Sequence, residues 1–514
     1  MRSKPSILRL ILGDQLNLKH SWFKLPNDDV VYVLMEVRQE TDYTLHHIQK
    51  VAAFFAAMRS FADRLKELGH RVIYLHLDAP DNRQALAENI QYLIEQHAFS
   101  QFEYILPDEF RLDAQLRALA QTLPIKCHPV DSEHFLTERQ DLADFFQGKK
   151  RYLMESFYRW MRKRHDILMD HGKPVGGKWN FDQKNRQTYD HKVPIPAPIL
   201  FENDVSEIVD CIQKKGVKTL GEIQAHRLIW PVTRDQALEL LDRFVTDVLP
   251  AFGTYQDAML STNWYLFHSR LSFALNSKML DPLEVIRAAV KAWQAQNPPV
   301  AIQQIEGFVR QVLGWREYMR GIYWTLMPKL ESSNYFSHTG DLPSFYWTGT
   351  TDMTCMQKTI TQSLQYAYAH HIQRLMVTGN FALLAGIDPQ AVDDWYLGIY
   401  IDAIQWVELP NTRAMSQFAD GGQVATKPYV SSARYINAMS DYCKSCNYDW
   451  KKRYGTGSCP FNSLYWDFFN RHRELLQKNA RIGMMYRTWD RMDSNQRKDI
   501  LRQAHAYRNN LNTL

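Results

Sequence analysis

The chain has 514 residues, which is too long for one hydrophobic core, so two or three domains are expected. Its net charge of +5 is mildly basic, which is compatible with binding to nucleic acid without indicating it. No apolar run reaches membrane-spanning length, and six cysteines in so long a chain argue against a disulfide framework, so a cytoplasmic protein is expected.

The first 132 residues alternate apolar runs with amphipathic stretches. The runs predicted to form buried strands are 6–12, 30–35, 71–77 and 104–106, with a further candidate at 125–129. Helical periodicity lies between them, over 44–69, 82–98 and 109–122. This order predicts an α/β, Rossmann-like domain with a parallel sheet and helices on both faces. Asp14 and Glu36 follow or end strands, where such sheets bind ligands, although turn residues at a solvated edge would look the same.

Residues 133–230 are less regular and are expected to connect two domains. A Gly-rich, basic and aromatic stretch over 173–186 ends in Arg186 and precedes several prolines. It is predicted to be a long loop. Long loops inside compact proteins often have a function, and a plain linker is the competing interpretation.

Residues 231–514 carry almost no strand signal and are predicted to form a large all-α domain. The stretches with helical spacing are 234–250, 302–327, 355–384, 389–404 and 461–478. The chain is also rich in rings, with 14 Trp, 26 Tyr and 25 Phe. A large helical core explains this most simply, and a protein that stacks on rings or passes electrons between them is the alternative.

Four of the cysteines are spaced like metal ligands. Cys443 and Cys446 form a C-x-x-C pair, Cys459 precedes a proline, and Cys355 lies far upstream. Four thiolates can hold zinc or an iron–sulfur cluster. A zinc ribbon would normally have a second C-x-x-C, which is absent here, and a remote ligand together with a Cys-Pro favours the cluster over zinc or no metal. Cys127 and Cys211 lack such a context and are expected to be fillers of the core.

Three other motifs are each weak alone. The run His268–Ser272 offers hydroxyls, an arginine and backbone donors that suit a phosphate. The run Trp315–Arg320 on a predicted helix fits a packed Trp with a buried ion pair. His370 and Arg374 would lie one helical turn apart, with His371 on another face and Asp402 able to pair with Arg374. The histidines suit either a hydrogen-bonded core or a proton donor in a pocket.

Taken in order, these motifs resemble the photolyase/cryptochrome superfamily over nearly the whole chain. The resemblance implies an antenna domain over 1–132, a connector over 133–230, and a helical FAD domain over 231–514. Ser269–Ser272 is similar to the family's FAD-phosphate loop, and Arg374 with Asp402 to the pair beside the isoalloxazine ring. The residues implied to bind FAD are Tyr255, His268, Ser269, Arg270, Leu271, Ser272, Trp315, Glu317, Arg374, Asp402 and Glu408.

The cysteine pattern resembles one branch of that superfamily, the iron–sulfur bacterial cryptochromes and photolyases, also called prokaryotic (6-4) photolyases. This implies a [4Fe–4S] cluster on Cys355, Cys443, Cys446 and Cys459. It also implies a 6,7-dimethyl-8-ribityllumazine antenna on the α/β domain, with Asp14 and Glu36 as its ligands. Departures from the ordinary photolyase pattern include Ala403 after Asp402, Phe273 after Ser272, and Glu408 where an Asn normally faces the flavin.

The resemblance implies an enzyme, a DNA photolyase that repairs (6-4) photoproducts in a flipped lesion with an electron from reduced FAD. His371 is the expected proton donor with His370 packed beside it, and Tyr429 is expected to contact the lesion. Arg186 is expected to enter the DNA duplex. Trp395 is the expected electron donor nearest the flavin, with Tyr396 and Trp347 further out; core packing is the alternative for all three. A monomer is expected.

Two alternatives remain open. A cryptochrome-type blue-light photoreceptor would share the fold and cofactors, but the His370–His371 pair and the Arg186 loop favour repair, as does the short segment after the last aromatic-rich helix. A nucleic-acid-binding protein without photochemistry is the second, because a helical four-Cys cluster domain also occurs in the large subunit of primases.

Overall fold

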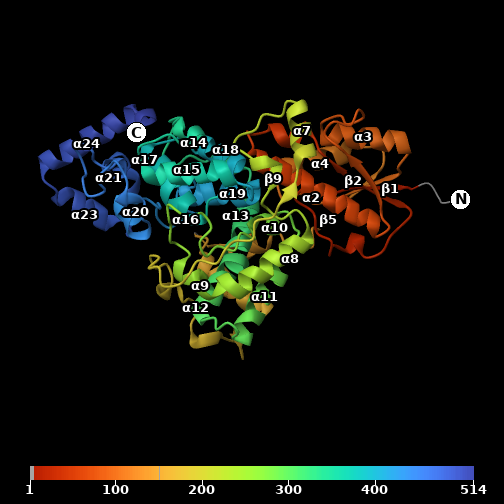
Figure 1. Ribbon diagram of the computed structural model, residues 1–514, viewed down its shortest axis with the longest axis horizontal. Helices are drawn as coiled ribbons and strands as arrows, with labels where there is room; N and C mark the ends of the chain where they lie inside the picture. Colours follow the sequence, from red (N-terminus) through yellow and green to blue (C-terminus); the bar gives the residue numbers. More distant parts are fainter. Residues whose placement is uncertain (1–4, 150) are drawn as a thin grey trace.

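The computed structural model describes residues 5–149 and 151–514. Its N-terminal part is built on a five-stranded parallel sheet in the order β3-β2-β1-β4-β5, at the right in Figure 1. The strands are β1 (Ile7–Leu10), β2 (Val30–Met35), β3 (Arg71–Leu75), β4 (Gln101–Ile105) and β5 (Lys126–Val130). The predicted parallel sheet is confirmed, and β2 has the predicted bounds.

Helices cover both faces of this sheet, as the alternation of apolar residues requires. Tyr32 and Leu34 of β2 pack with α2 in one core cluster, whereas Val31 and Val33 pack with α3 and α4 in another. The helices of this part are α1 (Arg38–Asp42), α2 (Ile48–Glu67), α3 (Leu86–His97) and α4 (Phe110–Thr122). The sheet is therefore buried on both sides, which explains its long apolar runs.

The connector is largely irregular, as predicted, with a few short elements. These are α5 (Asp141–Phe145), α6 (Met154–His165), α7 (Ser206–Lys214), β6 (Met169–Asp170) paired with β7 (Lys173–Pro174), and β8 (Asn203–Asp204) paired with β9 (Arg227–Leu228). After β7 the Gly-rich stretch continues with the 3-10 turns η2 (Val175–Gly177) and η3 (Asp182–Lys184).

The remainder is helical, as predicted; past β9 the described residues form no further strand of two or more residues. The first helices are α8 (Arg234–Arg243), α9 (Leu249–Tyr255), α10 (Ser272–Asn276), α11 (Pro282–Ala295), α12 (Ile302–Val309), α13 (Glu317–Leu326), α14 (Phe345–Thr348) and α15 (Thr354–Tyr366). Those that follow are α16 (His371–Gln373), α17 (Asn380–Ala385), α18 (Pro389–Ile399), α19 (Gln405–Leu409), α20 (Ala433–Met439), α21 (Pro460–Arg471), α22 (Arg473–Leu476), α23 (Gly483–Arg491) and α24 (Ser494–Asn509).

Two predicted helices were wrong in their continuity. The stretch 355–384 breaks after α15, where Ala367 has a φ of +51° and His370 is extended. The chain restarts as α16 and continues through the π-helical turn η8 (Arg374–Gly379) into α17. The stretch 389–404 likewise breaks at Tyr400, which is extended. His370 therefore lies before a helix instead of within one.

The helical part surrounds two large apolar clusters. One joins α2, the connector and the helices up to α13, and the other is formed chiefly by α15, α17, α18 and α21. In Figure 1 the second cluster lies toward the C-terminal end, away from the sheet. No described helix is both long and apolar enough to cross a membrane.

Candidate functional site

The expected ion pair between Arg374 and Asp402 is present at the centre of the helical part. Nη2 of Arg374 donates to both carboxylate oxygens of Asp402, at 2.9 and 3.2 Å. The guanidinium lies 3.7 Å from the ring centroid of Tyr400. Burial would lower the pKa of Arg374, but the Asp402 and Glu408 carboxylates outweigh it and raise that pKa. Arg374 is therefore a permanent cation held in one orientation.

The loop before α10 lies against this pair. Asn276, at the end of α10, donates to the Asp402 carbonyl at 2.8 Å. Arg270 has a left-handed φ of +56° and is buried, with Nη2 donating to the Ile199 carbonyl at 2.7 Å. Burial lowers the pKa of Arg270 to about 10. Among the described residues no carboxylate pairs with Arg270, so its buried charge suits an anion such as a phosphate.

The neighbours of Arg270 divide between polar and packing roles. Ser269 and Ser272 are half-buried with hydroxyls beside the loop, whereas Leu271 is in the core. Tyr255 stacks on Phe267 with a centroid separation of 5.0 Å, and its hydroxyl donates to Asp190 at 2.8 Å. The resemblance had implied that Tyr255 binds FAD, and here its hydroxyl is already occupied by the connector.

Three histidines gather beside the ion pair. His268 and His370 stack with centroids 4.3 Å apart and an interplanar angle of 15°. Burial lowers the pKa of His370 far below its ordinary value and that of His268 to about 4. His371 is exposed, yet its dense surroundings and the charges of Arg374 and Arg186 lower its pKa to about 4. All three imidazoles are therefore neutral at pH 7.

The packing partner of His370 differs from the expected one. The sequence suggested that His370 packs beside His371, but adjacent residues at the start of α16 diverge, and His370 stacks on His268 instead. Gln373 accepts from the backbone N–H of His370 at 3.1 Å, which holds the extended residue in place. The interruption of the helix between α15 and α16 places His370 against His268.

Two residues that the resemblance assigned to FAD lie toward the connector. Glu317 is fully buried and accepts from the Thr137 hydroxyl at 2.8 Å and the Leu136 N–H at 3.2 Å. Burial raises the pKa of Glu317 above its usual range. Trp315 is half-buried and packs edge-to-face on Tyr318 at 5.8 Å. The contacts of Glu317 join the helical part to the connector, whereas Trp315 packs within its own helical stretch.

A series of rings leads from Arg374 to the surface. Tyr400, under the guanidinium, is 5.9 Å from Trp395, and Trp395 is 5.1 Å from Tyr346. Tyr396 contacts Trp395 at 5.3 Å and donates to the Arg374 carbonyl at 2.6 Å. Tyr346 is followed in α14 by Trp347, which is 42% exposed. Sequence reasoning named Trp395, Tyr396 and Trp347 but missed the two tyrosines that connect them.

Arg186 projects from the connector toward the histidines. Its guanidinium is half-exposed and pairs with Asp182 at 2.7 Å and with Asp257 at 3.9 Å. Its charge is one of the causes of the low pKa of His371, so the two side chains are neighbours electrostatically. Tyr429, the other residue expected at the lesion, is half-buried at the junction of the two apolar clusters.

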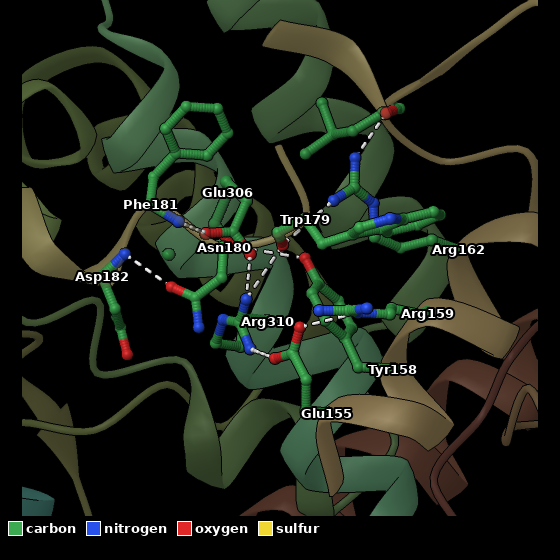
Figure 2. A network of polar contacts seen from close by, with 12 residues as sticks. Glu155, Tyr158, Arg159, Arg162, Trp179, Asn180, Phe181, Asp182, Glu306 and Arg310 are labelled. Atoms are coloured by element: carbon green, nitrogen blue, oxygen red, sulfur yellow. Dashed lines mark hydrogen bonds and ion pairs between the residues drawn. The ribbon is translucent and has the colours of Figure 1, made fainter. Parts of the chain in front are cut away.

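The loop that carries Arg186 is pinned by a buried network (Figure 2). Glu306 accepts from the Phe181 N–H at 3.1 Å and from Arg310 at 2.8 Å, and Arg310 donates to the Trp179 carbonyl at 3.0 Å. A further pair joins Arg310 to Glu155 of α6 at 2.5 Å. Glu306 and Arg310 are almost completely buried. A loop predicted from its glycines is therefore held by charges the sequence did not single out.

The four predicted cysteine ligands converge. Cys355, Cys443, Cys446 and Cys459 line one small cavity with the rings of Tyr442 and Trp450. Burial raises the pKa of Cys443 to about 12, which is unfavourable for a free thiolate. In the described part of the chain no three His, Cys, Asp or Glu side chains are arranged to hold a single metal ion.

The two remaining cysteines lie elsewhere. Cys211 is buried in the first cluster, and Cys127 is half-buried on β5. Neither lines the four-cysteine cavity, so the four spaced cysteines are grouped apart from these two, as expected.

A second cavity opens at the carboxyl ends of β1 and β4. The sheet order reverses between these strands, which is where such sheets bind ligands. Asp14 lines this cavity and pairs at 3.1 Å with Lys278, which also pairs with Asp108 at 2.7 Å. Burial raises the pKa of Asp14 to about 6 although Lys278 opposes the shift. Lys278 lies 264 residues from Asp14, so the sequence could not connect them.

Glu36 does not line that cavity. Its fully buried carboxylate is taken by Arg59, at 2.7 and 3.1 Å, by the Tyr74 hydroxyl at 2.7 Å, and by the Leu77 N–H at 2.9 Å. Glu40 of α1 lines the cavity instead. Glu36 does follow a strand end, as predicted, but Arg59 of α2 already pairs with the Glu36 carboxylate.

Known proteins resemble this chain in sequence and in fold. The family model described as deoxyribodipyrimidine photo-lyase-related protein matches residues 9–228. The chain is 44% identical over 505 residues to a (6-4) photolyase of Agrobacterium fabrum, covering 98% of this chain and 99% of that protein. The fold is similar to a bacterial class III photolyase from Agrobacterium tumefaciens, at a TM-score of 0.58 and 15% identity, covering 99% and 98% of the two chains. It is also similar to a Synechocystis sp. PCC6803 cryptochrome, at 0.54 and 14%, covering 96% and 94%.

Proposed function

Because this chain belongs to the photolyase family, we propose that it is a light-driven DNA repair enzyme whose substrate is the (6-4) pyrimidine–pyrimidone photoproduct. One observation carries this proposal. The Arg374–Asp402 pair, the three histidines and Arg186 lie together in one site. The relative of nearly equal length, aligned almost end to end, is a (6-4) photolyase.

We propose that FAD occupies the space around Arg374 and the 268–272 loop. Arg270, a buried cation without a carboxylate partner among the described residues, suits the flavin nucleotide's diphosphate. Arg374 and Asp402, with Glu408 at 3.8 Å, would hold the isoalloxazine ring. Bound FAD, reduced and excited by light, would supply the electron that splits the lesion.

The histidines suit the proton that this repair has to move, since a hydroxyl group must return from one pyrimidine to the other. His371 is the proposed donor because it is the exposed member of the three. It is neutral at pH 7, so it must gain a proton when the site fills; a DNA phosphate or another anion beside it would raise its pKa. His370, stacked on His268, would orient it, and Tyr429 is retained as a proposed lesion contact.

The series Tyr400, Trp395, Tyr396, Tyr346 and Trp347 is the proposed route by which the flavin is reduced from the surface. Support comes from ring separations of 5.1 to 5.9 Å along the buried members and from the exposure of Trp347. The series begins under Arg374, beside the proposed position of the isoalloxazine ring.

Two further cofactors are proposed. A [4Fe–4S] cluster suits four thiols spread around one cavity, because a cluster spans several atoms whereas zinc needs all its ligands at one point. A lumazine antenna suits the cavity beside Asp14, which has an apolar wall and a few convergent polar groups, as small-molecule sites do. Asp14 is retained as its proposed ligand, and Glu36 would act only through Arg59.

The test uses the protein purified in dim light with its cofactors. We expect a flavin absorption spectrum, and light-dependent loss of a defined (6-4) photoproduct from an oligonucleotide. The His371→Ala variant should keep the flavin spectrum and the affinity for damaged DNA yet lose repair. Flavin photoreduction without lesion loss in the unsubstituted protein would instead favour a photoreceptor, and absence of flavin would overturn the assignment of the site.

A further inference from the structure

Positive charge is concentrated in two segments of the chain. Residues 149–192 contain 12 Lys and Arg against five Asp and Glu, and residues 427–514 contain 16 against seven. These segments carry +7 and +9, whereas the whole chain carries only +5, so the rest carries −11. Such an uneven distribution of charge is typical of a protein that binds a polyanion through one surface.

The two segments touch each other beside the candidate site. The Thr188 hydroxyl donates to the Ala438 carbonyl of α20 at 2.6 Å. Tyr435 of the same helix donates to Asp257 at 3.4 Å, and Asp257 lies 3.9 Å from Arg186. Helix α20 also lines the four-cysteine cavity through Ala433 and Ile436. It therefore connects the loop expected to meet DNA with residues 434–459, which we call the cysteine segment.

The cysteine segment presents cations that the fold does not use. Its exposed basic side chains without a carboxylate partner in the described part of the chain are Arg434, Lys444, Lys451, Lys452 and Arg453. Further along, Arg471 and Arg473 are paired with Asp467 and Asp490. The five cations of the cysteine segment therefore remain available to an anion, as do exposed side chains such as Lys478 and Arg481 beyond it.

These cations stand on a fixed loop. Asn462 donates to the carbonyls of Trp450 and Lys452, at 2.8 and 2.7 Å, and Tyr507 donates to the Ser458 carbonyl at 2.6 Å. Lys444 lies within the C-x-x-C pair, and 451–453 lies between Cys446 and Cys459. Binding a polyanion would therefore not require the ordering of a mobile tail, which would otherwise weaken affinity.

We propose that the duplex-binding surface continues from the Arg186 loop across α20 onto the cysteine segment, where Arg434, Lys444 and residues 451–453 contact backbone phosphates flanking the lesion. This inference rests on the proposed function for the identity of the polyanion. It gives the four-cysteine site a second task besides holding a cluster, which is to shape a phosphate-binding surface.

The test compares two triple variants in the dark. K451Q/K452Q/R453Q removes three charges from the cysteine segment, and K214Q/K215Q/K218Q removes three exposed charges at and beyond the end of α7. In Figure 1, α7 lies near the sheet, and α20 and α21 lie at the left. The affinity of the cofactor-loaded protein for a long undamaged duplex is measured against salt concentration. The slope should fall by about 0.9 for each phosphate that the first variant no longer binds, and it should stay unchanged in the second variant.

An equal fall in both variants would mean that only net charge matters, and no fall in either would mean that this surface does not touch DNA; both results overturn the proposal. The flavin spectrum and thermal midpoint of each variant verify folding. Repair by the unsubstituted protein tests the proposed function separately, because the salt slope is measured on undamaged DNA and without light.

Discussion

At the scale of single residues, charge on Arg374 organises the candidate site. Asp402 holds it by two contacts on Nη2, and Glu408 lies further off at 3.8 Å. Without Asp402, Arg374 would remain buried and charged but would lose its nearer counter-charge. Breaking a buried ion pair in this way is strongly destabilising, because the burial of the remaining charge is no longer compensated. The site therefore depends on Asp402 more than on any other acid near it.

We predict that Asp402→Asn weakens retention of FAD. Removal of a charge-assisted hydrogen bond to a buried cation costs about 1.5 to 3 kcal/mol, which corresponds to roughly tenfold to a hundredfold in affinity. Flavin per protein after gel filtration measures this. The exposed Asp394, on the neighbouring helix α18, provides the control Asp394→Asn, which should keep its flavin.

The neutral histidines predict a pH dependence of stability. His268 has a pKa of about 4 in the folded chain against an ordinary value of 6.5, so the unfolded chain binds the proton first as pH falls. The free energy of unfolding should therefore decrease as pH falls from about 6.5 toward 4. His268→Gln should make that decrease shallower, as measured by urea denaturation at several pH values; an unchanged slope would contradict the buried neutral imidazole.

At the scale of elements, much of the α/β part could be predicted and part of the helical site could not. Strands such as Val30–Met35 were predicted because both faces of the sheet are buried, which leaves continuous apolar runs. The break at 367–370 has no glycine or proline to mark it and depends on tertiary contacts. Glu36 was misplaced because periodicity does not reveal that Arg59 and Tyr74 occupy its carboxylate.

The loop that carries Arg186 gives a prediction about an element. Replacing the buried pair Glu306 and Arg310 by Leu and Met together should lower the thermal midpoint, because apolar side chains cannot replace the hydrogen bonds that the pair makes to the loop backbone. The backbone of Trp179 and Phe181 would be left without these partners, and affinity for damaged DNA should fall by about tenfold.

A matched pair elsewhere is the control for this change. Arg9 and Glu103 pair at 2.7 Å on the sheet, and replacing them by Met and Leu should not alter DNA affinity. If the Glu306 and Arg310 variant folds and binds DNA normally, the network does not position the loop.

The series of rings gives a second prediction at this scale. Trp395→Phe should slow photoreduction of the flavin several-fold, because phenylalanine is much harder to oxidise while it keeps most of the packing. Transient absorption measures the rate. Trp489→Phe, a buried ring stacked on Trp466 at 5.4 Å, should leave the rate unchanged.

At the scale of the whole molecule, the cysteines join distant parts of the chain. Cys355 begins the α15 region, and its three partners lie about α20 and α21. The sequence predicted this convergence because thiol spacing carries a chemical meaning that packing residues lack. The salt bridges of Lys278 to Asp14 and Asp108 join the helical part to the sheet. They were not predicted, because no sequence spacing relates these three residues.

We predict that Cys459→Ser lowers iron and sulfide per protein and increases hydrogen exchange over the loop 443–459. Burial raises the pKa values of these thiols, so without a metal they would be protonated and unable to bridge the segments. Cys211→Ser is the control, because Cys211 lies in the other apolar cluster and should leave the iron content intact. Iron bound equally by both variants would contradict a four-cysteine site.

The central claim is that this molecule repairs one particular lesion with light. The most direct measurement illuminates the dim-light protein with two otherwise identical duplexes, one carrying a (6-4) photoproduct and the other a cyclobutane dimer, and follows restored thymines by chromatography. The account predicts light-dependent restoration of the (6-4) duplex and its loss with His371→Ala. Restoration of the cyclobutane dimer alone, or of neither lesion while the flavin is photoreduced, would contradict it.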